Sequence, residues 1–179
     1  IWDRLRLDGR KLFITGGSRG LGREMALAIA DAGADVVLVG RDAESLEQTA
    51  EDIRGFGRNA HTIVGDIGQP EQAEQICRDA LAEYGPFEIL INNVGGRRIN
   101  VPTEELPLDD WQTILDLNLT STFVCTKIIG GAMLKLPSGG RVINNASISG
   151  MIASRNIGGR SYEASKAAVI AFTRATAAD

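Results

Sequence analysis

The sequence is poor in several residue types that mark particular classes of protein. It has one histidine and two cysteines among 179 residues, and its formal net charge is −4. Cys77 and Cys125 are far apart and belong to no CxxC or Cys/His cluster, so we predict buried free thiols and no metal site. The negative charge and the lack of a basic run or aromatic ladder argue against nucleic-acid binding.

Long hydrophobic runs are also missing. No apolar stretch approaches the roughly 20 residues that a membrane span requires, and residues 1–6 contain no signal-peptide hydrophobic region. We therefore expect no membrane association and a cytoplasmic location. The single histidine, His61, lies in a predicted strand away from every other candidate residue. We interpret it as structural, so a histidine-dependent hydrolase has no support.

Apolar strand-like runs alternate with helix-like segments along the chain, which is typical of βαβ units and a parallel sheet. We predict strands at Lys11–Thr15, Asp35–Gly40, Ala60–Gly65, Glu88–Asn92 and Arg141–Ala146. Helices are predicted at Gly20–Ala32, Ala43–Gly55, Pro70–Tyr84, from about Leu108 to Leu134, and at Ser161–Ala177. Apolar residues at helical spacing predict two buried helix faces: Leu21, Met25, Ala28 and Ile29, and Ile114, Leu117, Leu119 and Phe123.

These elements predict one α/β domain over residues 1–179. We expect a Rossmann-type doubly wound parallel sheet with helices on both faces. Hydrophobic residues make up 44% of the chain, which is enough for a continuous core. In such folds the loops after the strands meet at one edge of the sheet, where ligands bind.

A glycine-rich loop, Thr15-Gly16-Gly17-Ser18-Arg19-Gly20-Leu21-Gly22, follows the first predicted strand and precedes a helix. The glycines at 16, 20 and 22 allow a tight turn, close approach of backbone amides to phosphate, and close packing of the helix on the sheet. Such a turn alone can be purely structural. Its place between a strand and a helix favours a dinucleotide whose pyrophosphate lies on the helix N-terminus.

The residue after the second strand is Arg41, where a strict NAD fingerprint has an acidic residue. Arg41 and Arg19 together can bind a 2′-phosphate through charge-assisted hydrogen bonds, which predicts NADP(H) rather than NAD(H). The alternative is a solvated Arg41 beside Asp42 as a helix cap. After the third strand, Asp66 and Ile67 can contact adenine, or Asp66 can simply cap a helix or turn the loop.

Tyr162 and Lys166 are four residues apart on the last predicted helix, so one face presents both. The pKa of a phenol is ordinarily near 10, and a neighbouring ammonium lowers it toward the range of a useful acid or base. Pairs at this spacing are common on helix surfaces, so this one alone is weak evidence. With the glycine loop it predicts an oxidoreductase.

The chain resembles a short-chain dehydrogenase/reductase over nearly all of its length. The matching elements, in the family order, are Thr15–Gly22, Asp66, Asn92-Asn93-Val94-Gly95, Asn118, Ser147 in Asn145–Gly150, and Tyr162 with Lys166. The resemblance implies a catalytic tetrad of Asn118, Ser147, Tyr162 and Lys166. Motifs and resemblance together imply cofactor contacts from Gly16, Ser18, Arg19, Gly20, Leu21, Gly22, Arg41, Asp66, Ile67, Asn93, Gly95, Tyr162 and Lys166.

The resemblance also implies a role for each member of the tetrad. Ser147 would donate to the substrate oxygen, and Tyr162 would transfer the proton. Lys166 would favour the phenolate and donate to the nicotinamide ribose, while Asn118 would hold a water that relays protons to Lys166. Ser149 is a less favoured alternative to Ser147.

The chain departs from the family pattern in several places. Val94 replaces the usual alanine, Ala146 stands where many relatives have a first serine, and residues 156–160 lengthen the segment before Tyr162. Family members continue after this helix with a substrate lobe and two further strands, which are missing here. We therefore expect either a fragment or a short form that a partner completes, and a homo-oligomer for the full-length protein.

Arginines near the expected mouth of the site bear on the substrate: Arg97, Arg98, Arg155 and Arg160. They can neutralise an anionic carbonyl or alcohol substrate, or they are ordinary surface residues. Similarity to gluconate 5-dehydrogenase-like members favours a sugar acid. The alternatives are a 3-oxoacyl thioester reductase acting on acyl carrier protein, and an NADP(H)-sensing or scaffold protein without turnover.

Overall fold

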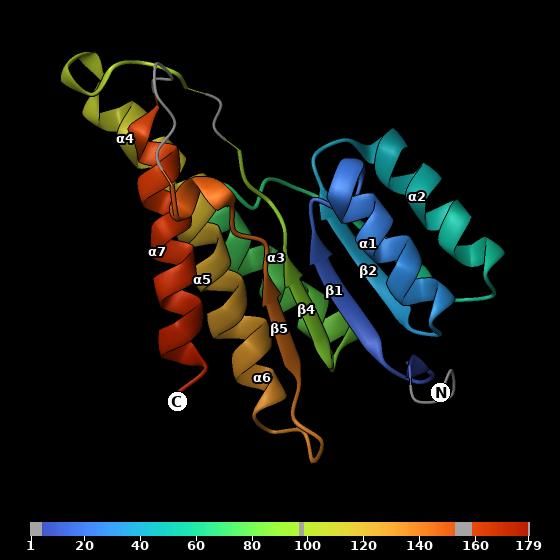
Figure 1. The fold of residues 1–179 in the computed structure, drawn as a ribbon. Coiled ribbons are helices and arrows are strands. Elements are labelled where there is room, and N and C mark those ends of the chain that lie inside the picture. The colour runs from blue at the N-terminus through green and yellow to red at the C-terminus, as the bar shows by residue number, and fades with distance from the viewer. Residues whose placement is uncertain (1–4, 97–98, 153–158, 179) are drawn as a thin grey trace.

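The computed structural model describes residues 5–96, 99–152 and 159–178. Its strands are β1 (Lys11–Thr15), β2 (Asp35–Gly40), β3 (Ala60–Val64), β4 (Ile89–Asn92) and β5 (Arg141–Asn144). They form one parallel sheet in the order β3-β2-β1-β4-β5. Figure 1 labels β2, β1, β4 and β5 of this sheet. The order reverses between β1 and β4, which is the arrangement of a doubly wound sheet.

Helices cover both faces of this sheet. They are α1 (Gly20–Asp31), α2 (Ala43–Gly55), α3 (Pro70–Tyr84), α4 (Leu108–Leu115), α5 (Ser121–Cys125), α6 (Gly131–Met133) and α7 (Arg160–Thr176). Leu12 and Ile14 of β1 pack with α1 and α2 on one face, whereas Phe13 between them packs with α3 and α5 on the other. This alternation follows from the two-residue period of a strand. The predicted α/β fold class is confirmed.

The apolar face predicted for α1 is confirmed only in part, because Met25 and Ile29 pack against the core whereas Leu21 does not. The buried residues of this helix are Gly22, Ala26 and Ala30, whereas Leu21 is 69% exposed. Residues with little or no side chain let the helix backbone approach the sheet closely, and this turns Leu21 outward. In the longer helix Ile114 and Leu117 are buried as predicted, but Phe123 is 46% exposed.

The helix predicted from Leu108 to Leu134 is not a regular α-helix. Two π-helical segments, η3 (Asp116–Thr120) and η4 (Thr126–Gly130), interrupt it between α4, α5 and α6. Each widened turn rotates the following residues relative to an α-helical pattern, so a fixed period cannot predict its buried face. Asn118 lies in the first of these segments, and such segments often occur at functional sites.

The two cysteines are free and buried, as predicted, and their sulfur atoms are 3.6 Å apart between α3 and α5. His61 stacks on Tyr84 with ring centroids 4.4 Å apart, in keeping with a structural role. Among the described residues, no helix is long and apolar enough to span a bilayer. The same part of the chain holds no cluster of three or more histidine, cysteine or acidic side chains that suits a metal ion.

Candidate active site

The segments that follow β1, β2, β3 and β4 surround an open cavity of about 210 Å³ at the carboxyl edge of the sheet. Its lining residues are Gly16, Ser18, Arg19, Gly40, Arg41, Gly65, Asp66, Ile67, Asn93, Val94 and Gly95. Most of the residues predicted to contact a cofactor are in this set. Parallel strands explain the grouping, because all their carboxyl ends point to one edge.

Glycine is required at several points of the loop after β1. Gly16 and Gly20 have φ angles of +71° and +55°, a region that side-chain-bearing residues seldom adopt. Gly22 is required for a different reason. A Cβ at this position would overlap the carbonyl oxygen of Gly16 and lie 2.5 Å from Nδ2 of Asn93. The start of α1 therefore packs directly on the glycine loop that lines the cavity.

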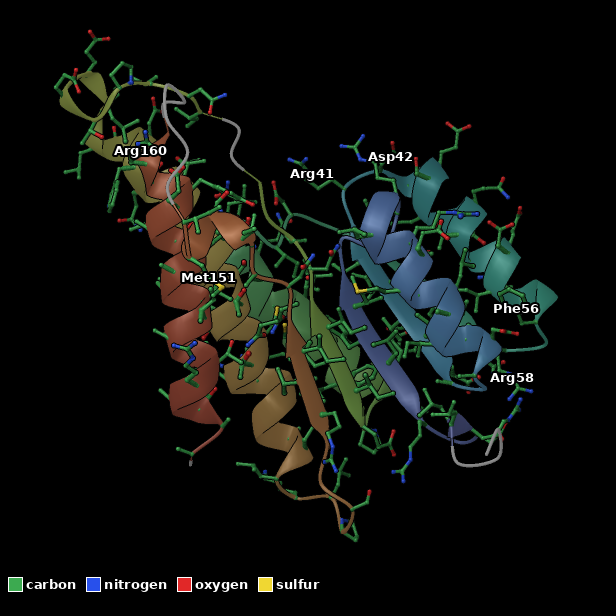
Figure 2. All side chains as sticks on the ribbon, in the orientation of Figure 1. Arg41, Asp42, Phe56, Arg58, Met151 and Arg160 are labelled. Carbon is green, nitrogen blue, oxygen red and sulfur yellow. The ribbon has the colours of Figure 1, made fainter. Side chains whose placement is uncertain are left out.

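Charged side chains of both signs meet where Arg41 and Asp66 line this cavity. Nη1 of the half-exposed Arg41 lies 3.5 Å from Oδ2 of Asp66, whose Oδ1 accepts a hydrogen bond of 2.9 Å from the amide of Gly68. Asp42 caps α2 by accepting from the amide of Ser45 at 3.0 Å. Figure 2 shows Arg41 and Asp42 together at the start of α2.

These contacts bear on the alternatives left open by the sequence. The hydrogen bond from the Ser45 amide holds the pKa of Asp42 below its ordinary value, and the nearby charge of Arg19 contributes further. Asp42 therefore caps α2, and Asp66 holds the turn after β3; an adenine contact from Asp66 stays a prediction. Neither contact removes Arg41 from the cavity edge, where its guanidinium is accessible to an anion.

A chain of hydrogen bonds joins the glycine loop to the last helix. Nδ2 of Asn93 donates to the carbonyl oxygen of Gly16 at 3.2 Å, and its Oδ1 accepts from Nδ2 of Asn145 at 2.8 Å. The carbonyl oxygen of Asn145 accepts from Nζ of Lys166, also at 2.8 Å. Thr15 supports this chain, because its Oγ1 accepts from the amides of Asn93 and Val94.

Sequence reasoning assigned no role to Thr15 or Asn145. The sequence did contain a signal for both residues. Thr15 is a polar residue at the end of β1, Asn145 is a polar residue directly after β5, and both strands lead to the edge of the sheet where ligands bind.

Lys166 is almost completely buried, with 4% of its surface exposed, and this burial lowers its pKa. Asn118 is fully buried. Its Oδ1 accepts from the amide of Gly96 at 2.9 Å, and its Nδ2 donates to the carbonyl oxygens of Gly96 and Ile114. A Cβ on Gly95 would lie 2.7 Å from Oδ1 of Asn118 and 2.9 Å from Nζ of Lys166. Asn118 and Lys166 therefore pack against the same glycine.

Ser147 and Tyr162 lie on two segments that pack against each other. Ser147 begins the 3-10 turn η5 (Ile148–Gly150), and its Oγ accepts from the amide of Ser149 at 3.1 Å. Tyr162 is half-buried in the first turn of α7, one turn before Lys166. Gly150 at the end of η5 contacts the backbone of α7 at Lys166. All four predicted tetrad positions thus belong to one region of the molecule.

The remaining predicted residues have different outcomes. Leu21 lies on the exposed side of α1, and Ile67 is buried and lines the cavity. Arg160 forms an ion pair of 3.0 Å with Glu163 at the start of α7. The other three predicted arginines, Arg97, Arg98 and Arg155, lie outside the described residues.

Comparison with known proteins adds independent evidence. A family model described as short chain dehydrogenase matches residues 10–179. Galactitol 2-dehydrogenase of Rhizobium johnstonii is 36% identical over 178 residues, which cover 99% of this chain and 68% of that protein. The 3-oxoacyl-[acyl-carrier-protein] reductase of Synechocystis sp. is 34% identical over 172 residues, covering 96% and 68%.

A solved structure is similar to nearly the whole chain. It is a gluconate 5-dehydrogenase from Burkholderia cenocepacia in complex with NADP and tartrate. Its TM-score is 0.87 at 32% identity, and the match covers 99% of this chain and 68% of that one. The chain therefore spans about two thirds of the length of these three relatives.

Proposed function

We propose that this chain, which belongs to the short-chain dehydrogenase family of oxidoreductases, is the part of an NADP(H)-dependent enzyme that binds the cofactor and transfers the proton. The observation that carries this proposal is the hydrogen-bonded chain from Gly16 through Asn93 and Asn145 to Lys166. A reaction that moves a hydride and a proton to one carbonyl group needs the cofactor and the acid side by side. These three hydrogen bonds support a cofactor and an acid placed side by side within a single domain over residues 1–179.

The cavity residues fit a nicotinamide dinucleotide, which would supply the hydride. The glycine loop and the first amides of α1 suit a pyrophosphate. Arg19 and Arg41 suit a 2′-phosphate, and Asp66 with Ile67 suits adenine. The NADP-bound gluconate 5-dehydrogenase structure supports the preference for NADP(H).

The tetrad residues would each act on a proton or an oxygen. Tyr162 would donate the proton to the carbonyl oxygen in reduction and accept it in oxidation. Ser147 would donate a hydrogen bond to the same oxygen and so stabilise the charge that develops there. Lys166, as an ammonium one helical turn from Tyr162, would favour the phenolate, and Asn118 would support proton relay to Lys166.

The substrate in this proposal is a secondary alcohol or carbonyl compound, with a sugar acid as the first candidate. The gluconate 5-dehydrogenase and galactitol 2-dehydrogenase relatives support that choice. The second candidate is a 3-oxoacyl thioester, which the Synechocystis reductase supports. We expect the full-length protein to be a homo-oligomer, which light scattering would measure.

The test of the reaction is NADPH oxidation by the full-length protein with 5-ketogluconate and an acetoacetyl thioester side by side. Tyr162→Phe is the matched control, because it removes the transferable proton and keeps the ring. Turnover with either substrate that is lost in Tyr162→Phe, with NADPH binding retained, is the expected result. NADPH binding without turnover on any tested carbonyl would favour the sensing or scaffold protein instead.

Arg41→Ala tests the cofactor preference. Loss of a charge-assisted hydrogen bond, worth about 1.5–3 kcal/mol, should weaken NADPH binding by about 10- to 100-fold. NADH binding should change little, because NADH lacks the 2′-phosphate. Fluorescence titration measures both dissociation constants, and an unchanged ratio between them would rule out this role for Arg41.

A further inference from the structure

The segment from Asn145 to Gly150 contacts Lys166 at two separate points. The carbonyl oxygen of Asn145 accepts the hydrogen bond from Nζ of Lys166 at 2.8 Å. Five residues later, the backbone of Gly150 lies directly on the peptide bond between Lys166 and Ala167. A Cβ at Gly150 would be 2.7 Å from C of Lys166, 2.8 Å from N of Ala167 and 2.9 Å from O of Lys166.

Ser147 and Gly150 are the two ends of one tight turn. The amide of Gly150 donates to the carbonyl oxygen of Ser147 at 3.0 Å, and Oγ of Ser147 accepts from the amide of Ser149 at 3.1 Å. A displacement of Gly150 therefore moves Ser147 with it. On the other side of the contact, Tyr162 and Lys166 belong to one helix, α7, of 17 residues. Figure 2 shows Met151, the next residue, beside this helix.

We propose that Gly150 is a positioning residue that fixes the spacing between Ser147 and the face of α7 that carries Tyr162 and Lys166. This inference rests on the proposed function. The three atoms nearest to such a Cβ all belong to the backbone of a long helix, which cannot rotate aside as a flexible side chain can. Only a residue without Cβ lets the turn and the helix approach this closely.

Alanine at position 150 must push the turn away from α7. A Cβ seldom lies within 3.0 Å of another heavy atom, so the two segments have to separate by at least a few tenths of an ångström. Ser147 then moves away from Tyr162. Misplacement of about 1 Å can reduce the rate of an enzymatic reaction about 100-fold, so such a shift is large enough to measure.

The experiment compares Gly150→Ala with Gly131→Ala in the full-length protein. Gly131 begins α6, which lies near the amino end of β5 in Figure 1, whereas η5 follows the carboxyl end of that strand. A Cβ at Gly131 meets nothing within 4 Å. For Gly150→Ala we expect kcat to fall about 10- to 100-fold, with an NADPH dissociation constant close to that of the unchanged protein. Gly131→Ala should keep both values.

Two further measurements separate positioning from a structural role. Urea unfolding of Gly150→Ala should show a folded protein with one cooperative transition. Combining Gly150→Ala with Ser147→Ala should add little to the loss caused by Ser147→Ala alone, because both changes act on the same hydrogen bond to substrate. Losses that multiply in the double variant would overturn the proposal. Loss of NADPH binding or of the folded state in Gly150→Ala would also overturn it.

The outcomes also separate this inference from the proposed function. If Tyr162→Phe and Ser147→Ala abolish turnover while Gly150→Ala keeps full kcat, the inference about Gly150 alone is wrong. If Tyr162→Phe keeps full turnover, the proposed function itself fails, whatever Gly150→Ala does.

Discussion

Replacement of Asn118 by alanine removes three hydrogen bonds from a fully buried side chain. Two of them hold the amide and carbonyl of Gly96, at 2.9 and 3.0 Å, and the third reaches the carbonyl oxygen of Ile114 at 2.9 Å. At about 1 kcal/mol per hydrogen bond the loss is about 3 kcal/mol. The higher helix propensity of alanine returns about half a kcal/mol. We therefore expect the free energy of unfolding to fall by about 2–3 kcal/mol.

Urea unfolding followed by circular dichroism measures this loss. For a small domain with an m-value of about 2 kcal/mol per molar, the midpoint should fall by about 1 M or more. Gln112→Ala is the matched control on the same long helix. Gln112 is exposed and donates to Asp116 at 3.0 Å, so its removal should change stability by less than about 0.5 kcal/mol. Equal midpoints for the two variants would refute the idea that Asn118 holds the segment after β4.

The remaining predictions concern the glycine loop and the buried lysine. Gly22→Ala places a methyl group against Gly16 and Asn93, so it should cost about 1–3 kcal/mol of stability and weaken NADPH binding. Gly55→Ala is the control for Gly22→Ala, because its methyl group meets nothing within 4 Å. Urea unfolding measures the stability of the two variants, and fluorescence titration measures their NADPH binding. Equal NADPH binding by Gly22→Ala and Gly55→Ala would contradict the packing argument. Burial lowers the pKa of Lys166 in the folded chain, so the unfolded chain binds the proton of this lysine more tightly. The free energy of unfolding therefore rises with pH between the lowered pKa and the ordinary value of 10.5. Lys166→Met should remove this rise, and parallel stability curves for the two proteins across that pH window would show that Lys166 does not cause it.

Local patterns predicted a large part of the fold. The observed bounds of β1, β2, α2 and α3 coincide with the predicted ones. Strong local signals explain this agreement. Both strands are almost wholly buried runs, Asp42 caps α2, and Pro70 stands in the first turn of α3. The predicted strands at 60–65, 88–92 and 141–146 were each longer than the observed strands by one or two residues.

Prediction failed where packing decides the geometry of an element. The π-helical segments around Asn118 and Lys127 cannot be predicted from the spacing of hydrophobic residues in an α-helix, because the wider turn changes which residues face the core. The outward position of Leu21 follows from the close approach of α1 to the sheet, which Gly22 and Ala26 permit. A pattern that counts only apolar side chains places Leu21 on the buried face of α1 instead.

The sequence alone determined the fold class, the glycine loop and the spacing of Tyr162 and Lys166, because each depends on residues that are neighbours in a strand, a turn or one helical turn. Only the tertiary structure decided that Asn93 and Asn145 connect the glycine loop to Lys166, and that Gly150 lies on the backbone of α7. These contacts join segments that are far apart in the chain. The order of strands in the sheet and the close packing of backbones bring them together, and neither is encoded in any local stretch of residues.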